Sequence, residues 1–206
     1  MKDLPKQLAA GITLCVFICS GCVTLERNSP ERHYFAIELP QSVESSNSTS
    51  NRTLSVANLR ISPRFADRSF VYRTSETGYE SDFYNQFLTW PDTMITEELR
   101  KGLAASQEFK YVLGPADAEP PNYVLEGSVT GLYGDFRNSS QPAAVLEIEV
   151  FLYNENSSNA GIVMQKRYMK SVPLKEKSPE ALVQGWDQAL QQIVTALAGD
   201  LKAANL

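Results

Sequence analysis

Three runs in the second half of the chain decide its fold: YVLEGSVTGLYGDF (Tyr123–Phe136), AAVLEIEVFLY (Ala143–Tyr153) and IVMQKRYMKSV (Ile162–Val172). In each run, apolar residues alternate with polar or small ones, which is the period-two pattern of a strand with one buried face. The segments between the runs contain Asn, Ser, Gly and Pro, which favour turns. The runs therefore predict an antiparallel meander, whose buried face is expected to hold Tyr123, Leu125, Val129, Tyr133, Leu146, Ile148, Val150 and Leu152.

Shorter strands are predicted on the amino-terminal side of the meander. The run HYFAIEL (33–39) alternates in the same way, and TLSVANLRI (53–61) follows it after a Ser/Asn-rich stretch (41–52). We expect that polar stretch to be a mobile loop. Residues 69–90, which have a glycine near their centre, indicate a hairpin or two short strands, and FKYVL (109–113) indicates one more.

Two helices are predicted to flank this sheet. Segment 89–106 has apolar residues at helical spacing, and Thr89 is its expected N-cap residue. The longest helical pattern covers residues 178–203 and includes Trp186, which we expect to be buried against the sheet. The predicted fold class is α/β: a mixed, largely antiparallel β-sheet flanked by helices, in a single domain over residues 33–206.

The amino-terminal residues have the pattern of a secretion signal. Two lysines precede the apolar run LAAGITLCVFI, which is too short to cross a membrane, and a small Ser-Gly pair precedes Cys22. The pattern resembles the lipobox of bacterial lipoproteins, although Cys19 stands where that pattern usually has Leu. The resemblance implies that residues 1–21 are a signal peptide, that Cys22 is acylated, with palmitate as one acyl group, and that residues 22–32 are a lipidated tether.

Cys19 and Cys22 also form a CxxC, for which a zinc half-site and a redox pair are the alternatives. Zinc needs about four ligands, but no second cysteine pair follows and His33 is the single histidine of the chain. No metal or cofactor is therefore expected. Removal of the signal peptide would also remove Cys15 and Cys19, so that no disulfide is expected within the mature chain.

The charge of the chain limits its possible partners. Loss of residues 1–21 removes two of the 19 Lys and Arg residues and one of the 24 Asp and Glu residues, which leaves a net charge of −6. Proteins that bind nucleic acid need a basic surface. An acidic domain therefore argues against a nucleic-acid partner, and also against purely electrostatic binding to anionic lipid.

No group of residues suggests catalysis. A Ser-His-Asp or Cys-His arrangement needs a histidine beside the nucleophile, and His33 lies beside the tether. Glu97 and Glu98 are adjacent on a predicted helix and do not face each other. Glu147 and Glu149 fit the solvent side of an alternating strand. We therefore expect a protein that is not an enzyme.

Segment 69–90 holds seven of the twenty aromatic residues. We expect most of these rings to pack the sheet against the helices. The alternative is a groove or a subunit contact, because aromatic residues and Arg are enriched at interfaces. The candidate partner or subunit interface consists of Tyr72, Arg73, Tyr79, Phe83, Tyr84 and Trp90.

Several motifs follow one another in a familiar order: the lipobox, YFAIEL, FVYR (Phe70–Arg73), YESDFYNQFLTWP with Trp90 and Pro91, and LEG (Leu125–Gly127) within the meander. This order resembles the ABC-type transport auxiliary lipoprotein family, above all its PqiC-like members. The resemblance covers essentially the whole mature chain, and it assigns no catalytic role to any of these residues.

The resemblance implies a fold similar to the anticodon-binding or TolB N-terminal type. It also implies a periplasm-facing lipoprotein that acts beside an MCE-domain protein (PqiB-like), as a non-enzymatic accessory subunit in lipid transport between membranes that supports membrane integrity. Val23, in place of Asp, after the cysteine favours the outer membrane. A homo-oligomeric ring is the expected assembly. A self-contained periplasmic lipid-binding carrier is the alternative, and would need an apolar cavity of several hundred cubic ångströms.

Overall fold

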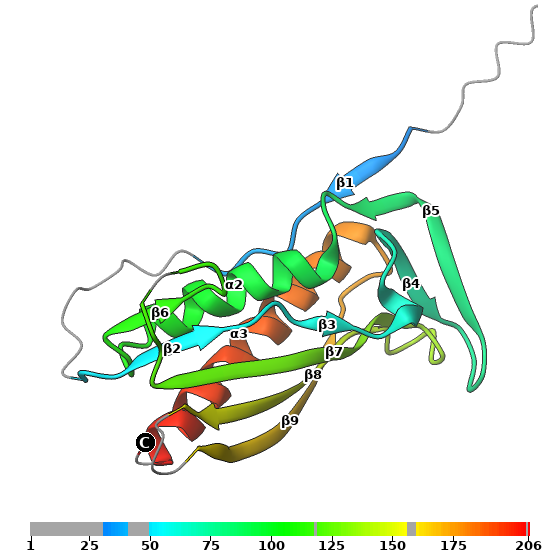
Figure 1. Cartoon of the computed structure of the whole chain (residues 1–206). Coiled ribbons are helices and arrows are strands. Elements are labelled where there is room, and N and C mark those ends of the chain that lie inside the picture. Colours follow the sequence, from blue (N-terminus) through cyan, green and yellow to red (C-terminus); the bar gives the residue numbers. More distant parts are fainter. Residues whose placement is uncertain (1–30, 41–49, 118, 156–159, 205) are drawn as a thin grey trace, which may run out of the picture. The chain divides into compact units, whose positions relative to one another are not determined.

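The predicted meander forms the largest part of the sheet in a computed structural model, which describes residues 31–40, 50–117, 119–155, 160–204 and 206. Strands β7 (Tyr123–Asp135), β8 (Ala143–Asn154) and β9 (Gly161–Pro173) pair in sequence order, and both ladders are antiparallel. Figure 1 shows these three long strands side by side. The meander is confirmed.

Short strands extend the sheet on the amino-terminal side of β7. They are β1 (His33–Phe35), β2 (Thr53–Val56), β3 (Arg60–Ile61), β4 (Ser69–Arg73), β5 (Tyr79–Phe87) and β6 (Tyr111–Leu113). Among the described residues the nine strands form one mixed sheet, in which the order β1-β5-β4-β7-β2-β6 includes one antiparallel pair, β4 with β5. The predicted mixed sheet and the hairpin within 69–90 are confirmed.

Three of the predicted strands are shorter than expected, and the one predicted over 109–113 is limited to β6, Tyr111–Leu113. The strand predicted over 33–39 ends at Phe35, because the backbone N–H groups of Glu38 and Leu39 donate to carboxylates of the two helices. The segment 53–61 divides into β2 and β3, which both pair with β7, because the intervening Leu59 donates its N–H to the Thr96 hydroxyl. Most of the predicted loop 41–52 lies outside the described residues, as do the signal peptide and Cys22.

Two helices pack on one face of the sheet, as predicted: α2 (Pro91–Ala105) and α3 (Pro179–Ala203). Helix α3 contacts β8, β9 and α2. Ser178 caps α3 by accepting a hydrogen bond from the Ala181 N–H at 3.2 Å. The N-cap predicted for α2 is wrong by one residue: Trp90, with an extended backbone and no side-chain cap, precedes Pro91 and takes the place assigned to Thr89.

The core is centred on a cluster of three aromatic rings. Trp186 is fully buried, as predicted, with its ring centroid 5.0 Å from that of Phe70 and 5.3 Å from that of Phe87. Its indole Nε1 donates to the backbone oxygen of Val145 on β8 at 3.2 Å. A buried indole needs such a partner, so this residue joins α3 to the sheet through packing and a hydrogen bond together.

A register shift between Val129 and Gly131 changes which face of β7 is buried against the helices. Leu125 and Val129 face the core, as predicted. Beyond the shift, Leu132 pairs with core-facing Leu146, and Tyr133 points to the opposite face. The prediction that Tyr133 shares the core face is therefore wrong, because one extra residue in a strand reverses the alternation that follows it.

Candidate functional site

The β4–β5 hairpin encloses a hollow of about 670 Å³ together with the short 3₁₀ segment η1 (Pro63–Phe65). The turn of the hairpin is fixed by hydrogen bonds from the Thr74 N–H to the Gly78 oxygen at 3.0 Å and from the Gly78 N–H to Ser75 Oγ at 2.8 Å. The lining residues are Arg64, Val71, Arg73, Glu76, Thr77 and Tyr79.

Arginine and carboxylate side chains pair with one another at and beside this hollow. Arg73 Nη2 donates to the Glu76 backbone oxygen at 2.9 Å, and its guanidinium lies 5.7 Å from the ring centroid of Tyr79. Arg73 Nε is buried and has no partner among the described residues. Arg137 pairs with Glu76 at 2.8 Å and with Asp135 at 2.7 Å, and its hydrogen bond holds the pKa of Asp135 below the usual range.

Tyr79 belongs to a small aromatic cluster on the sheet face that α2 and α3 leave uncovered. Its ring meets Phe65 and Tyr133 edge to face, at centroid distances of 6.4 and 6.0 Å. Phe65 and Tyr133 stack on each other at 5.8 Å and are buried, whereas 38% of Tyr79 remains exposed. The rigid rings beneath Tyr79 hold it in place while leaving part of its surface open to a partner.

A sharp corner in β5 is built around Asp82. The carboxylate accepts hydrogen bonds from the Tyr72 hydroxyl at 2.6 Å and from the backbone N–H groups of Tyr84 and Asn85 at 2.8 and 3.1 Å. Partial burial acts to raise the pKa of Asp82, but the hydrogen bonds outweigh it and hold this pKa below its usual range. The ladder with β4 shifts register at this point, so that Phe83 is turned outward.

Most of the aromatic residues in segment 69–90 do not pack the sheet against the helices, so that interpretation is wrong. Phe70 and Phe87 are buried in the core, and the remaining rings are partly or largely exposed because of the hairpin turn and the Asp82 corner. The six residues of the candidate interface fall into two groups. The hairpin group is Tyr72, Arg73 and Tyr79, and the corner group is Phe83, Tyr84 and Trp90.

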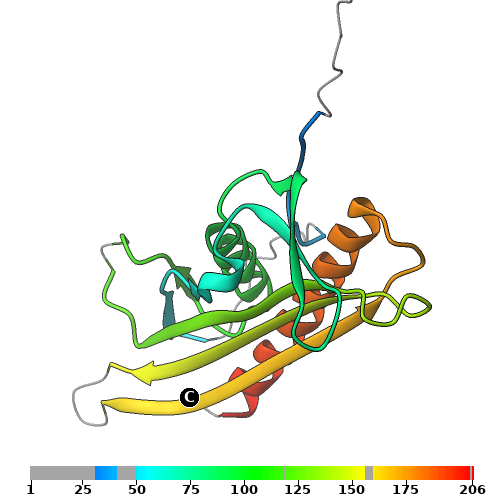
Figure 2. The same ribbon diagram turned by 90° about the vertical axis from the view of Figure 1, so that its right-hand side faces the viewer.

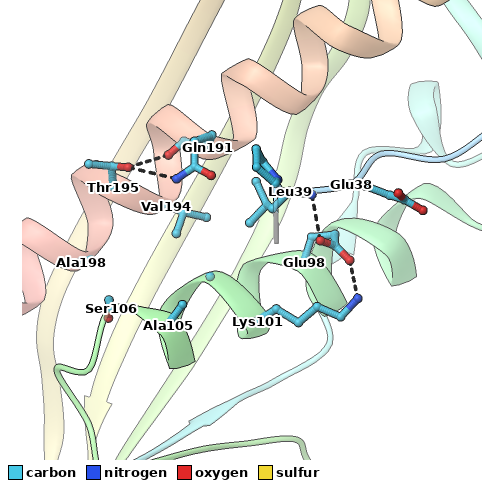
Figure 3. Close-up of a pocket in the computed structure, with 12 residues that line it drawn as sticks. Glu38, Leu39, Glu98, Lys101, Ala105, Ser106, Gln191, Val194, Thr195 and Ala198 are labelled. Atoms are coloured by element: carbon cyan, nitrogen blue, oxygen red, sulfur yellow. Dashed lines mark hydrogen bonds and ion pairs between the residues drawn. The ribbon is translucent and has the colours of Figure 1, made fainter. Parts of the chain in front are cut away.

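A second hollow, of about 650 Å³, lies between α2 and α3 (Figure 3). Glu98 on α2 accepts from the Leu39 N–H at 2.9 Å and from Lys101 Nζ at 2.6 Å. Polar groups of Gln191 and Thr195 face the hollow from α3. The lining therefore mixes an ion pair and amide and hydroxyl groups with short apolar side chains, and it differs from an apolar lipid cavity.

Asp187 on α3 makes the folding stability of the protein depend on pH. Its carboxylate accepts from the Glu38 N–H at 3.0 Å. Burial raises the pKa of Asp187 to about 6, and the charges of Glu38 and Glu98 act in the same direction. The unfolded pKa is about 3.9, so between these values the folded state holds a proton that the unfolded state has lost. The contribution of Asp187 to stability is therefore fully present below about pH 4 and is lost as the pH rises through about 6.

Asp187→Asn should consequently stabilise the protein at neutral pH and flatten its stability profile below pH 6. An asparagine keeps the acceptor for the Glu38 N–H but cannot ionise. Because the side chain is partly open to water, which screens the charge, we expect a gain of about 1 kcal/mol. Urea unfolding across this pH range measures it, with Asp187→Ala, which loses the acceptor, as the control. Parallel profiles of parent and Asp187→Asn would contradict the assignment.

The remaining candidate residues take ordinary places in the fold. His33 is exposed at the start of β1, and Glu147 and Glu149 lie beside Arg167 on the outer side of the sheet, at 3.5 and 3.6 Å. Glu97 is exposed whereas Glu98 is buried. Within the described ranges no group of three or more His, Cys, Asp or Glu side chains could hold a metal ion.

Sequence reasoning missed the residues that build the two exposed groups. Arg64 and Arg137 at the hairpin, and Asp82 at the corner, are brought to these places by turns and register shifts rather than by a periodic pattern. Asp often forms a local turn in which its carboxylate accepts a hydrogen bond from the backbone N–H two residues later. The presence of Asp82 within segment 69–90 was the only sequence signal for the corner. For the part of the chain that is described, no helix combines the length and the apolar character needed to cross a membrane.

Solved structures share this fold at low sequence identity. The crystal structure of protein XCC0632 from Xanthomonas campestris matches with a TM-score of 0.72 and 16% identity, over 84% of this chain and 96% of that one. An uncharacterized protein matches with a TM-score of 0.67 and 17% identity, over 83% and 99%. The hypothetical protein CT253 from Chlamydia trachomatis matches with a TM-score of 0.50 and 12% identity, over 75% and 99%. These likenesses show the fold alone.

The family is shown by a match to its sequence model. No curated protein matches the chain. Residues 35–198 match the family described as the ABC-type transport auxiliary lipoprotein component, and this range includes every strand from β2 to β9, helix α2 and most of α3. The chain therefore belongs to the ABC-type transport auxiliary lipoprotein family, as the order of its motifs indicated.

Proposed function

We propose that this protein is an outer-membrane lipoprotein, anchored through Cys22 and facing the periplasm, that serves an MCE-type lipid transport system as a non-enzymatic accessory subunit. The family match over residues 35–198 carries the proposal, because that family consists of auxiliary components of ABC-type transport. The MCE-domain partner, PqiB-like, follows from the PqiC-like character of the motifs. In this role the protein supports membrane integrity by holding its partner, and it performs no chemistry itself.

The proposed assembly is a homo-oligomeric ring in which the hairpin group contributes to the contact between subunits. A closed ring requires heterologous contacts, in which two different patches of each subunit meet. The hairpin offers the features of a contact site: the partly exposed Tyr79 ring on a rigid aromatic base, and beside it a hollow with Arg64 and Arg73 on its rim. A carboxylate of the neighbouring subunit would suit the guanidinium groups there.

The alternative, a lipid-binding carrier, has less support. The hollow between α2 and α3 has the volume of a ligand site, but the Glu98–Lys101 ion pair lies in it and its walls mix polar groups with short apolar side chains. Native mass spectrometry of the protein purified from membranes separates the two functions. An oligomer without bound phospholipid would support the accessory subunit, and a monomer that retains one phospholipid would support the carrier and overturn the proposal.

Tyr79→Ala should shift the oligomer towards monomer. The change removes the exposed ring of the hairpin group, and because the neighbouring rings stay stacked on each other we expect only about 1 kcal/mol of stability to be lost. Sedimentation velocity of the chain from Cys22 onward, without lipid, measures the change. Tyr111→Ala is the matched control, since Tyr111 is an exposed tyrosine on β6 at the other end of the strand order.

The same sedimentation experiment tests two separate claims, that the protein forms a ring and that the hairpin group contributes to the contact between subunits. A parent that is monomeric at tens of micromolar would exclude the ring. An oligomer that tolerates Tyr79→Ala as well as it tolerates Tyr111→Ala would reject the placement of the contact at the hairpin.

A further inference from the structure

We propose that the corner of the sheet formed by β1 and β5 lies on the bilayer to which the protein is anchored, with its aromatic side chains in the interface of the lipid headgroups. The partner that we assign to this surface is a phospholipid membrane. The inference rests on the anchoring through Cys22 that belongs to the proposed function.

The surface is a patch of large apolar side chains that the fold leaves uncovered. It gathers around β1, the second half of β5 and the start of α2, which lie at the same end of the sheet in both views (Figures 1 and 2). We call it the corner patch, and its members, with their exposed fractions, are Tyr34 (49%), Phe83 (59%), Tyr84 (42%), Leu88 (61%) and Trp90 (56%). Exposed apolar patches of this kind mark sites of interaction with proteins or membranes.

The corner patch is held in place by specific contacts. The Asp82 carboxylate fixes the backbone at Tyr84, and the rings of Phe83 and Tyr84 meet edge to face at 5.3 Å. The Leu88 N–H donates to the oxygen of Phe35 at 2.7 Å, which fastens the end of β5 to β1. The exposed rings are therefore presented by a rigid backbone, and little conformational entropy would be lost when a partner covers them.

Two arginines are interleaved with these rings. The guanidinium of Arg32 lies 4.1 Å from the ring centroid of Phe83, and that of Arg68 lies 5.3 Å from the ring centroid of Tyr34. Arg68 is fixed further by a hydrogen bond of 2.9 Å from its Nε to the oxygen of Phe87. Aromatic rings with Arg beside them match the region between acyl chains and phosphates, where Trp and Tyr are enriched in membrane proteins.

The position of the corner patch in the chain favours the membrane over another occupant. The domain begins with β1, so a chain that starts at an anchored Cys22 enters the fold at Arg32, in contact with Phe83. The ten residues between Cys22 and His33 span at most about 33 Å when fully extended. Such a short link keeps the corner patch at a high effective concentration beside the bilayer. Its residue Tyr34 lies in β1, the first described strand after the anchor.

The two tryptophans of the protein make this inference measurable. Trp90 is exposed in the corner patch and Trp186 is fully buried in the core. Bromine atoms on acyl chains quench an indole only at short range, so they would reach Trp90 in a docked domain and would not reach Trp186. The chain from Cys22 onward contains the whole compact unit Arg32–Leu206 and a single cysteine, Cys22. It can therefore be coupled to a maleimide lipid at its natural point of attachment.

We expect the coupled protein to lose at least a third of its tryptophan fluorescence when phosphatidylcholine vesicles contain brominated in place of ordinary acyl chains. Trp90→Phe should remove nearly all of this quenching, because only Trp186 remains. Phe83→Ser combined with Leu88→Ser should reduce it at least twofold. The matched control is Tyr111→Ser combined with Met169→Ser, which removes two side chains that are also about half exposed from other strands and should leave the quenching unchanged.

Equal quenching of the parent and Trp90→Phe would overturn the inference, and this comparison does not depend on the folding of the double variants. Quenching that the control pair reduces as much as the corner pair would also overturn it. The coupling is chemical, so the result does not depend on acylation in the cell or on a transport partner. Failure of the proposed function would instead be seen as an unmodified Cys22 or as a lipid-retaining monomer.

Discussion

Trp186→Ala should lower the free energy of unfolding by about 3–5 kcal/mol, the usual cost of truncating a buried tryptophan. The indole contacts Phe70 and Phe87 and donates to the Val145 oxygen, so the change removes the centre of the core and leaves a buried acceptor without its partner. Typical domains have only about 5–15 kcal/mol of stability. In a domain of this size the melting temperature should fall by roughly 6–20 °C.

The protein supplies its own control for this experiment. Trp90→Ala removes the same side chain from an exposed position, at the N-cap of α2, where it makes no capping hydrogen bond. Surface changes of this type usually stay within about 0.5 kcal/mol. Thermal melts followed by circular dichroism compare the two variants with the parent. Equal melting temperatures for Trp186→Ala and Trp90→Ala would show that α3 does not depend on this contact.

The elements that local pattern determines were predictable from the sequence. The alternation in β8 and the helical spacing in α3 repeat over about ten residues or more, β7 alternates as far as its register shift, and the Ser178-Pro179 pair marks the start of α3. Trp186 could be assigned to the core for the same reason, because it falls on the apolar face of a long amphipathic helix. Secondary structure is predicted most reliably from sequence where a segment is long and periodic.

Features that depend on distant parts of the chain were not predictable. The short strands β1, β2 and β3 pair in parallel with β5, β6 and β7, and nothing in two to four residues encodes a partner that is distant in sequence. The register shift in β7 could not be predicted either. Leu132 and Tyr133 are both apolar and lie between two glycines, so the sequence does not show which of the two side chains faces the core. Burial of this kind is decided by tertiary pairing.

The exposed aromatic residues show the same limit at the candidate site. The sequence shows that segment 69–90 contains seven aromatic residues. It does not show which of these rings point away from the core because of the corner at Asp82. Phe83 and Phe87 are the same residue type four positions apart in one strand, and one is exposed while the other is buried. The difference lies in four hydrogen bonds to a single carboxylate.

Cys22→Ala should abolish the lipid anchoring of the mature chain. Acylation requires the cysteine sulfur, and no other cysteine follows in the chain. Burial of acyl chains contributes about 0.8 kcal/mol for each CH₂ group, and firm anchoring takes more than one chain or an additional membrane contact. The variant should therefore be recovered as a soluble chain or as an uncleaved precursor. Cell fractionation followed by mass spectrometry of the intact protein measures both, and Cys19→Leu, which restores the residue usual for a lipobox, is the matched control that should remain anchored.

This experiment also separates the anchor from the corner patch. Rings at the headgroup level give reversible binding, which dilution or washing removes, whereas two or more acyl chains hold through such treatment. If the corner patch contacts the bilayer, a fraction of the Cys22→Ala chain should bind to membranes at first and then be lost on washing, and Trp90→Ser in the same background should reduce that fraction. Mature protein that stays on the membrane through washing and carries an unmodified thiol at Cys22 would contradict the lipid anchor.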